Sequence, residues 1–152
     1  MQLDDLYREV IVDHYNHPRN YGKPKKWDIV VEGKNPVCGD EIRIYLNVKD
    51  NVVSDVHFEG KGCSISIASA SVMTEALRGK SLTEVKTILA DFNQMLRGEA
   101  CDRCEDYSDA IAFQGVTKFP VRVKCALLAW KTVEEVVNAN GDGSTPDTVT
   151  TE

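Results

Sequence analysis

The first residues that could do chemistry are a thiol and a carboxylate two positions apart, Cys38 and Asp40. They lie in a loop that follows Asn35-Pro36 and ends just before a segment of alternating polar and apolar residues. Gly39 between them lets the loop bend and lets other groups approach closely. Such a pair can point toward one metal ion, or one group can tune the other. Taken alone, the pair is better explained by a chance loop thiol.

Two further cysteines lie at the start of one expected helix and within another. Cys63 follows Gly62 at the expected start of a helix, where the positive end of the helix dipole favours a thiolate, the form that binds metals and attacks sulfur. Cys125 falls early in the last expected helix, on the flank of its apolar stripe with Arg122 and Ala129. A buried structural thiol remains the alternative for both cysteines.

Three thiols and one carboxylate, from Cys38, Asp40, Cys63 and Cys125, make a tetrahedral Zn²⁺ site plausible. The residues are too far apart in the sequence for a zinc finger, so the fold would have to assemble the site. Spacing alone does not prove this assembly. The same thiolate set also accepts iron.

The pair Cys101 and Cys104 has the Cys-x-x-Cys spacing of a redox or metal motif. It lies in a loop-rich segment, and two thiols make only half of a zinc site, so we expect incidental exposed thiols. Five cysteines are an odd number, and a reducing compartment disfavours structural disulfides. His14 and His17 are expected to pack or bond near the end of the first helix, and His57 to face solvent.

Hydrophobic periodicity predicts the elements that must position these residues. Helical spacing predicts an amphipathic helix over residues 3–15. A short strand is expected over 27–32. Clean alternation over 42–48 and 52–58, on either side of Asp50-Asn51, predicts a β-hairpin.

The second half of the chain is predicted to be helical. Helices are expected over 64–78 and 82–97, and the last helix begins at Pro120, which needs no amide donor there. Residues 98–120 are polar and irregular, with one or two helical turns. Residues 140–152 are rich in Gly, Ser, Thr, Pro and Asp and are expected to be a disordered tail.

This order of elements predicts an α+β domain over residues 1–139. We expect a small three-stranded antiparallel sheet, helices packed mainly on one face of it, and a long C-terminal helix. The net charge of −6 argues against a nucleic-acid or membrane partner. No apolar run is long enough for a bilayer and no secretory signal is evident, so the cytoplasm is the expected compartment.

Several stretches resemble the U-type iron–sulfur cluster assembly family, which includes IscU-like and NifU N-terminal-like proteins. They are Asn35-Pro36-Val37-Cys38-Gly39-Asp40, Phe58-Glu59-Gly60-Lys61-Gly62-Cys63-Ser64-Ile65-Ser66, Ala68-Ser69-Ala70-Ser71 and Arg122-Val123-Lys124-Cys125-Ala126. Asp13-His14-Tyr15 and His17-Pro18-Arg19-Asn20 also match. The resemblance covers residues 3–138. It implies an α+β fold in which Cys38, Asp40, Cys63 and Cys125 converge on one exposed pocket.

The family has two branches. In the scaffold branch a [2Fe–2S] cluster is built in the pocket, a histidine usually precedes the third cysteine, and a Pro-Pro segment is recognised by a dedicated Hsp70 chaperone. This chain has Lys124 and Phe119-Pro120-Val121 at those places. The SufU branch resembles it in having Arg122 with Lys124 and an insertion, here residues 98–118. The resemblance therefore favours SufU, whose members hold Zn²⁺ and accept persulfide sulfur.

In the mechanism that this resemblance implies, Cys38 is the persulfide acceptor. The metal keeps the thiols deprotonated, and Cys38 leaves it to attack the terminal sulfur of a persulfide on a pyridoxal-phosphate cysteine desulfurase similar to SufS. Arg122 is expected to stabilise the anionic persulfide or to bind Asp40, with a surface ion pair as its alternative. Downstream, the sulfur would pass to an assembly scaffold or to apo-proteins.

Two alternative functions use the same ligands. In one, Cys38, Cys63 and Cys125 hold a transient [2Fe–2S] cluster that the protein passes to apo-proteins. In the other, structural zinc stabilises an adaptor that activates the desulfurase by docking. Lys124 and the insertion favour sulfur transfer over the scaffold. The reactivity of Cys38 separates transfer from docking.

Overall fold

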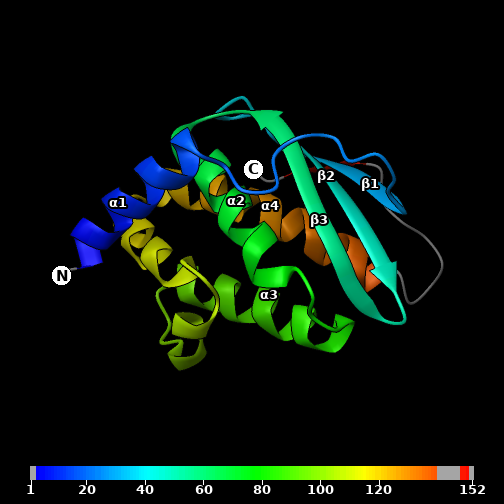
Figure 1. Ribbon diagram of the computed structural model, residues 1–152. Coiled ribbons are helices and arrows are strands. Elements are labelled where there is room, and N and C mark those ends of the chain that lie inside the picture. Colours follow the sequence, from blue (N-terminus) through cyan, green and yellow to red (C-terminus); the bar gives the residue numbers. More distant parts are fainter. Residues whose placement is uncertain (1–2, 140–147, 151–152) are drawn as a thin grey trace.

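The computed structural model describes residues 3–139 and 148–150, which form an α+β arrangement. The elements are α1 (Leu3–Asn16), β1 (Ile29–Asn35), β2 (Asp40–Lys49), β3 (Val52–Lys61), α2 (Ser64–Leu77), α3 (Leu82–Leu96), the 3₁₀ helices η1 (Asp102–Asp106) and η2 (Ala110–Lys118), α4 (Pro120–Ala139) and β4 (Thr148–Thr150). Figure 1 shows the helices on one side of the sheet, which confirms the predicted fold class.

The predicted hairpin is present as β2 and β3. Its two turn residues, Asp50 and Asn51, have φ values of 52° and 64°, as a type I′ turn requires. The strands pair antiparallel, with Ile44 opposite Phe58. Both of these side chains are fully buried, so the alternation in the sequence correctly identifies the face of the sheet that the helices cover.

The sheet has one strand more than predicted. Its order is β3-β2-β1-β4, and β4 pairs parallel with β1, with Glu32 opposite Thr148. The expected disordered tail is therefore wrong for residues 148–150, while residues 140–147 and 151–152 lie outside the described residues. The physical reason is that β1 would otherwise present an unpaired edge, and Thr-Val-Thr is a good strand sequence to cover it.

Small side chains let α2 lie at the centre of the helical layer. Its buried residues include a run of serine and alanine, and it packs between α1 and α4. A capping box begins α3, where Ser81 and Glu84 exchange hydrogen bonds. None of the helices in the described ranges combines the length and apolarity needed to cross a bilayer.

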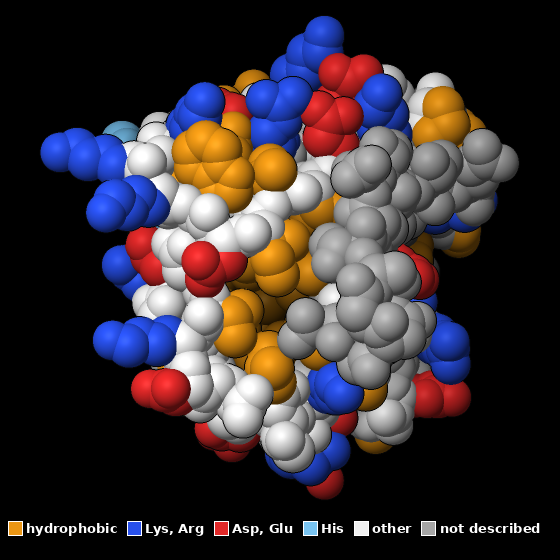
Figure 2. All heavy atoms as spheres, turned by 90° about the vertical axis from the view of Figure 1, so that its right-hand side faces the viewer, with side chains coloured by type: hydrophobic (Ala, Val, Ile, Leu, Met, Phe, Trp, Pro, Cys, Tyr) orange, Lys and Arg blue, Asp and Glu red, His pale blue; other side chains and the backbone are white. Residues whose placement is uncertain are grey.

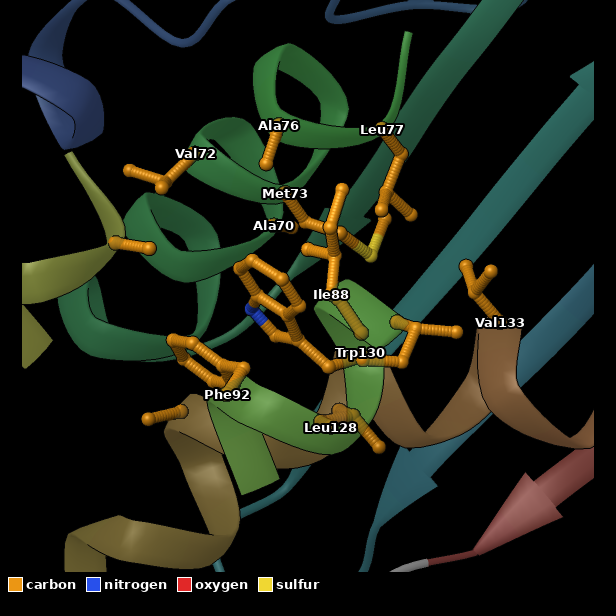
Figure 3. Packing of buried hydrophobic residues seen from close by; sticks show 14 of the residues in the cluster. Ala70, Val72, Met73, Ala76, Leu77, Ile88, Phe92, Leu128, Trp130 and Val133 are labelled. Atoms are coloured by element: carbon orange, nitrogen blue, oxygen red, sulfur yellow. The ribbon is translucent and has the colours of Figure 1, made fainter. Parts of the chain in front are cut away.

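The largest buried side chain, Trp130 of α4, organises the core between the helices (Figure 3). Its ring stacks on Phe92 of α3 with centroids 3.7 Å apart and an interplanar angle of 8°. The indole N–H donates to Ser69 Oγ at 2.9 Å, and this hydroxyl donates to the Ala126 carbonyl at 2.6 Å. One residue therefore joins α2, α3 and α4. Figure 2 shows hydrophobic side chains gathered in a central hollow of one face, with charged side chains mainly toward the edges of the view.

The approach of β1 to α4 depends on Gly33. A Cβ atom at this position would collide with Thr132 Oγ1 and lie 3.2 Å from Leu128 Cδ1. Because glycine has no side chain, the strand can lie directly against the helix. This contact brings the end of β1, at Asn35, close to the first turns of α4, where Cys125 lies.

Residues 98–120 are more ordered than the polar sequence predicted. Cys101 and Cys104 are joined by a disulfide, and Cys104 is fully buried. The expectation of incidental exposed thiols is therefore wrong. The η1 turn folds back on α3, which places Cys104 in the core and brings the two Cα atoms to 5.5 Å, within the range that a disulfide spans.

The η1 turn and the residue after it are also held by a buried carboxylate of α3. Asp91 is 5% exposed, and its two oxygens accept hydrogen bonds from Arg103, at 2.8 Å, and from the Tyr107 hydroxyl, at 2.5 Å. Burial, followed by the bond to Asp91, raises the pKa of Tyr107 from 10.0 to about 12. This phenol must therefore stay protonated for the contact to persist.

A pH dependence of stability follows from Tyr107. Between pH 10 and about 12 the unfolded chain releases the phenol proton while the folded protein keeps it, so the free energy of unfolding falls as pH rises. Below pH 10 this contribution is fully present. In Tyr107→Phe we expect the free energy of unfolding to fall less steeply over this pH range than in the unsubstituted protein. Urea unfolding at a series of pH values measures it. Tyr15→Phe, at an exposed position, is the control, and equal slopes for the two variants would contradict the assignment.

Candidate metal centre

Four different elements present the predicted donors. Cys38 lies in the turn between β1 and β2, where Gly39 adopts a φ of +74° and its N–H donates to the Asn35 carbonyl at 2.9 Å. Asp40 is the first residue of β2. Cys63 is the N-cap of α2, and Cys125 lies in the second turn of α4. The fold thus brings residues from both halves of the chain to one end of the sheet.

Three of the four predicted donors form a compact group. The ligand atoms of Cys38, Asp40 and Cys125 all lie within 4.8 Å of one another, and the two sulfur atoms are 3.3 Å apart. The thiol of Cys63 is not part of this group of three. Its backbone N–H, however, donates to Asp40 Oδ1 at 2.9 Å, which places the fourth predicted donor beside the others.

The carboxylate of Asp40 tests whether these residues fit a metal ion. Asp40 is 1% exposed, and its Oδ2 has no hydrogen-bond partner in the described part of the chain. A Cβ atom on Gly62 would lie 2.6 Å from Asp40 Oδ1, so the glycine leaves just enough room for the carboxylate. A buried, unpartnered carboxylate oxygen is costly unless a cation satisfies it. Together with thiolate sulfurs it is a donor set that suits zinc.

The environment of the sulfurs controls their charge. Burial raises the pKa of the Cys125 thiol, and the neighbouring Cys38, Asp40 and Cys63 raise it further. Arg122 is exposed, and the sulfur of Cys125 first and that of Cys63 second raise the pKa of its guanidinium. Within the described residues Arg122 forms no salt bridge, so neither of the ion pairs considered for it, with Asp40 or at the surface, is present there.

Sequence reasoning missed two residues that contact or face the site. Asn35 is 1% exposed, and its side-chain N–H donates to Cys125 Sγ at 3.7 Å. Tyr7 of α1 is half-buried, and its pKa is raised by burial and then by the Cys63 charge. Asn35 does occur in a recognisable stretch beside Cys38. Tyr7 carries no signal beyond its place in the periodicity of the first helix.

A second group of potential metal donors, His14, Glu75 and Asp109, is centred on a buried, hydrogen-bonded histidine. His14 is fully buried, its Nε2 bonds to Asp109 Oδ2 at 2.9 Å, and its Nδ1 bonds to Ser71 Oγ at 2.7 Å. Glu75 lies 3.8 Å from the same Nε2. The expectation that His14 bonds near the first helix is confirmed. His57, expected to face solvent, is mostly buried: 23% of its side chain is exposed, and its Nδ1 lies 3.3 Å from Asp55 Oδ2.

Three exposed apolar residues are close in the sequence to the residues of the candidate metal centre. Val37 precedes Cys38, and Phe119 and Val121 flank the start of α4 just before Arg122. Their exposed fractions are 71%, 51% and 69%. Exposed large apolar residues beside a reactive site are typical of a surface that contacts another protein.

Comparisons with known proteins identify the family of this chain. The model of the NifU-like N terminal domain matches residues 6–126. The chain is 46% identical to the zinc-dependent sulfurtransferase SufU of Bacillus subtilis over 142 residues, which cover 93% of this chain and 96% of the relative. It is 41% identical to the iron–sulfur cluster assembly scaffold protein IscU of Thermotoga maritima over 132 residues, covering 87% and 92% of the two chains.

A solved structure has the same fold. The crystal structure of a candidate scaffold protein for iron–sulfur cluster assembly by the SUF system, from Fervidobacterium islandicum, superimposes with a TM-score of 0.79 at 38% identity. The match covers 86% of this chain and 95% of that structure.

Proposed function

The chain belongs to the family of the NifU-like N terminal domain, and from this premise we propose that it is a zinc-dependent sulfurtransferase of iron–sulfur cluster assembly. The observation that carries the proposal is the half-exposed thiol of Cys38, 3.3 Å from the buried sulfur of Cys125 and grouped with the unpartnered carboxylate of Asp40. Sulfur transfer requires a reachable nucleophile beside a metal-binding donor set, and this arrangement supports that role for Cys38.

Cys38, Asp40, Cys63 and Cys125 would hold the zinc ion. When bound, zinc keeps the thiols deprotonated, including Cys125, whose pKa burial raises in the protein alone. The side-chain N–H of Asn35 donates to the Cys125 sulfur and so fixes its orientation.

Cys38 accepts the sulfur. Its thiolate attacks the terminal sulfur of a persulfide on the donor protein, a new S–S bond forms at Cys38, and the donor cysteine leaves as a thiolate. Cys38 suits this role because its turn contains Gly39 and because its sulfur is more accessible than that of Cys125. Arg122, which faces the sulfurs, stabilises the negative charge of the resulting persulfide.

The donor would be a pyridoxal-phosphate cysteine desulfurase of the SufS kind. Val37, Phe119 and Val121 offer it an apolar contact surface around the acceptor thiol. The acceptors of the sulfur would be an assembly scaffold or apo-proteins. The cytoplasm is the proposed compartment, because Cys38, Cys63 and Cys125 must remain reduced to function.

A scaffold function is the second candidate, favoured by the 41% identity to a protein named as an assembly scaffold. In that case a [2Fe–2S] cluster is the cargo, and Cys38, Cys63 and Cys125 are its ligands. The buried carboxylate of Asp40 then lies beside the cluster.

Metal and acid-labile sulfide analysis of the protein, purified without oxygen, distinguishes the two functions. We expect about one zinc per chain, no sulfide and no visible absorption band. Asp40→Ala should lose the zinc while keeping its fold by circular dichroism, because it removes the one carboxylate of the set. Iron and sulfide in equal amounts, with a [2Fe–2S] spectrum, would establish the scaffold function instead.

A further inference from the structure

The disulfide between Cys101 and Cys104 lies outside the metal centre and has two unequal ends. Cys101 precedes η1 and is half-buried, whereas Cys104 is fully buried in the core. Cys101 is therefore the more accessible end of the disulfide for an incoming thiol. Thiol–disulfide exchange depends on which sulfur is accessible to attack.

Three hydrogen bonds hold the segment around the disulfide without involving sulfur. Before it, Gln94 Nε2 donates to the Ala100 carbonyl at 3.2 Å. Between and after the cysteines, Arg103 and Tyr107 donate to the buried carboxylate of Asp91. Opening the S–S bond therefore leaves the turn attached to α3, and both redox states can share one fold.

A hydrogen-bond acceptor is available to the thiol of reduced Cys104. The Asp91 backbone carbonyl lies 3.7 Å from Cys104 Sγ, within hydrogen-bonding range of sulfur. A disulfide has no S–H to donate, so only the reduced cysteine uses this acceptor. The thiol formed by reduction is then both buried and hydrogen-bonded, which removes the penalty of an unpartnered polar group.

From these observations we propose that Cys101 and Cys104 are a reversible thiol–disulfide exchange site that reacts with dithiols. A thiolate of the dithiol attacks Cys101 Sγ, the S–S bond breaks, and its electron pair goes to Cys104 Sγ, which takes up a proton. The second thiol of the dithiol then attacks the mixed disulfide and releases Cys101. Two electrons and two protons pass to the protein, and the dithiol becomes a disulfide.

The preference for dithiols follows from the position of Cys104. In a mixed disulfide on Cys101, the Cys104 sulfur lies within one turn and re-forms the original bond before a second free monothiol arrives. A dithiol carries its second thiol on the same molecule and competes with this return. Glutathione alone is therefore expected to leave the site oxidised.

A redox titration of the zinc-loaded chain tests the proposal. The protein is equilibrated at a series of ratios of reduced to oxidised dithiothreitol, alkylated and cleaved with trypsin. Cleavage after Arg97, Arg103 and Lys118 leaves each thiol of the pair in its own peptide. We expect both thiols to appear together, as one two-electron couple, and to disappear on re-oxidation while the circular dichroism of the fold is retained. A bond reduced only after unfolding, or thiols that never pair, would overturn the proposal.

Single variants test the direction of attack and the class of reductant. When Cys104→Ser is treated with oxidised glutathione, the Cys101 thiolate attacks its S–S bond and one reduced glutathione leaves. We expect the resulting mixed disulfide on Cys101 to be stable and to form about ten or more times faster than one on Cys104 in Cys101→Ser, because Cys101 is the more accessible cysteine. Equal rates would contradict the predicted direction. Full reduction of the unsubstituted protein by glutathione at the thiol concentration that suffices for dithiothreitol would contradict the preference for dithiols. Neither result depends on sulfur transfer at the metal centre.

Discussion

Replacing Cys38 by serine is expected to reduce persulfide transfer to the background rate. Serine is close to cysteine in shape, but its hydroxyl is not deprotonated near neutral pH and cannot form the S–S bond with the incoming sulfur. The measurement is desulfurase turnover with and without the protein, together with the mass of the peptide that contains Cys38 after reaction. We expect the unsubstituted protein to gain one sulfur atom on that peptide and to accelerate turnover.

Zinc content must be measured on the same sample. Loss of one donor is expected to lower zinc affinity by about 100-fold or more, since changes in the outer shell alone cost about 10–100-fold. The zinc concentration is therefore raised until Cys38→Ser is fully loaded. If the loaded variant still supports full turnover, the protein acts by docking, and the transfer mechanism is wrong. Cys101→Ser is the matched control, because it replaces a cysteine outside the metal centre, just before η1, and should transfer sulfur normally.

Replacing Trp130 by alanine is expected to cost about 3–5 kcal/mol of unfolding free energy, the range for removing a large aromatic side chain from a core. Trp130 is 2% exposed, stacks on Phe92 and donates to Ser69, so its removal leaves a cavity and an altered hydrogen-bond chain between α2 and α4 (Figure 3). A domain of this size is stable by about 5–15 kcal/mol, so the variant is close to its unfolding threshold. Urea unfolding with zinc present measures the loss.

Two other variants separate the contributions of size and polarity. Trp130→Phe keeps an aromatic ring against Phe92 but loses the N–H donor to Ser69, and we expect it to recover part of the loss. Trp27→Ala removes a half-buried indole that meets Tyr45 edge-on at 5.1 Å, and we expect a cost of about 1 kcal/mol. If Trp27→Ala is as destabilising as Trp130→Ala, the core is not centred on Trp130.

Local patterns in the sequence predict much of this fold because they depend on neighbours in the chain. The alternation around Asp50-Asn51 specifies a hairpin, and Ser81 with Glu84 specifies a helix start, whatever the rest of the molecule does. Strand β4 could not be predicted in this way. Its pairing depends on the free edge of β1, more than a hundred residues earlier, and the three residues Thr-Val-Thr are too few to predict a strand by themselves.

The candidate site shows the same division between local and distant information. The residue types of Cys38, Asp40 and Cys125 predict a metal site, and the fold brings these three donors together. That the Asp40 carboxylate is buried with one oxygen unpartnered depends on how β2 meets α2, which no spacing rule contains. The prediction of exposed thiols at Cys101 and Cys104 is wrong for a related reason. The burial of Cys104 follows from the packing of η1 on α3, which the local sequence does not specify.

The distribution of the metal donors along the chain has a consequence during synthesis. Cys38, Asp40 and Cys63 leave the ribosome well before Cys125, which arrives only with the last helix. Until then the first two thiols have no complete coordination sphere and are open to oxidation or to the wrong metal. Loading is thus a late event in the life of each new molecule, and it follows closure of α4 over the sheet. For the proposed zinc-dependent function, zinc and thiol reductants are needed at that moment.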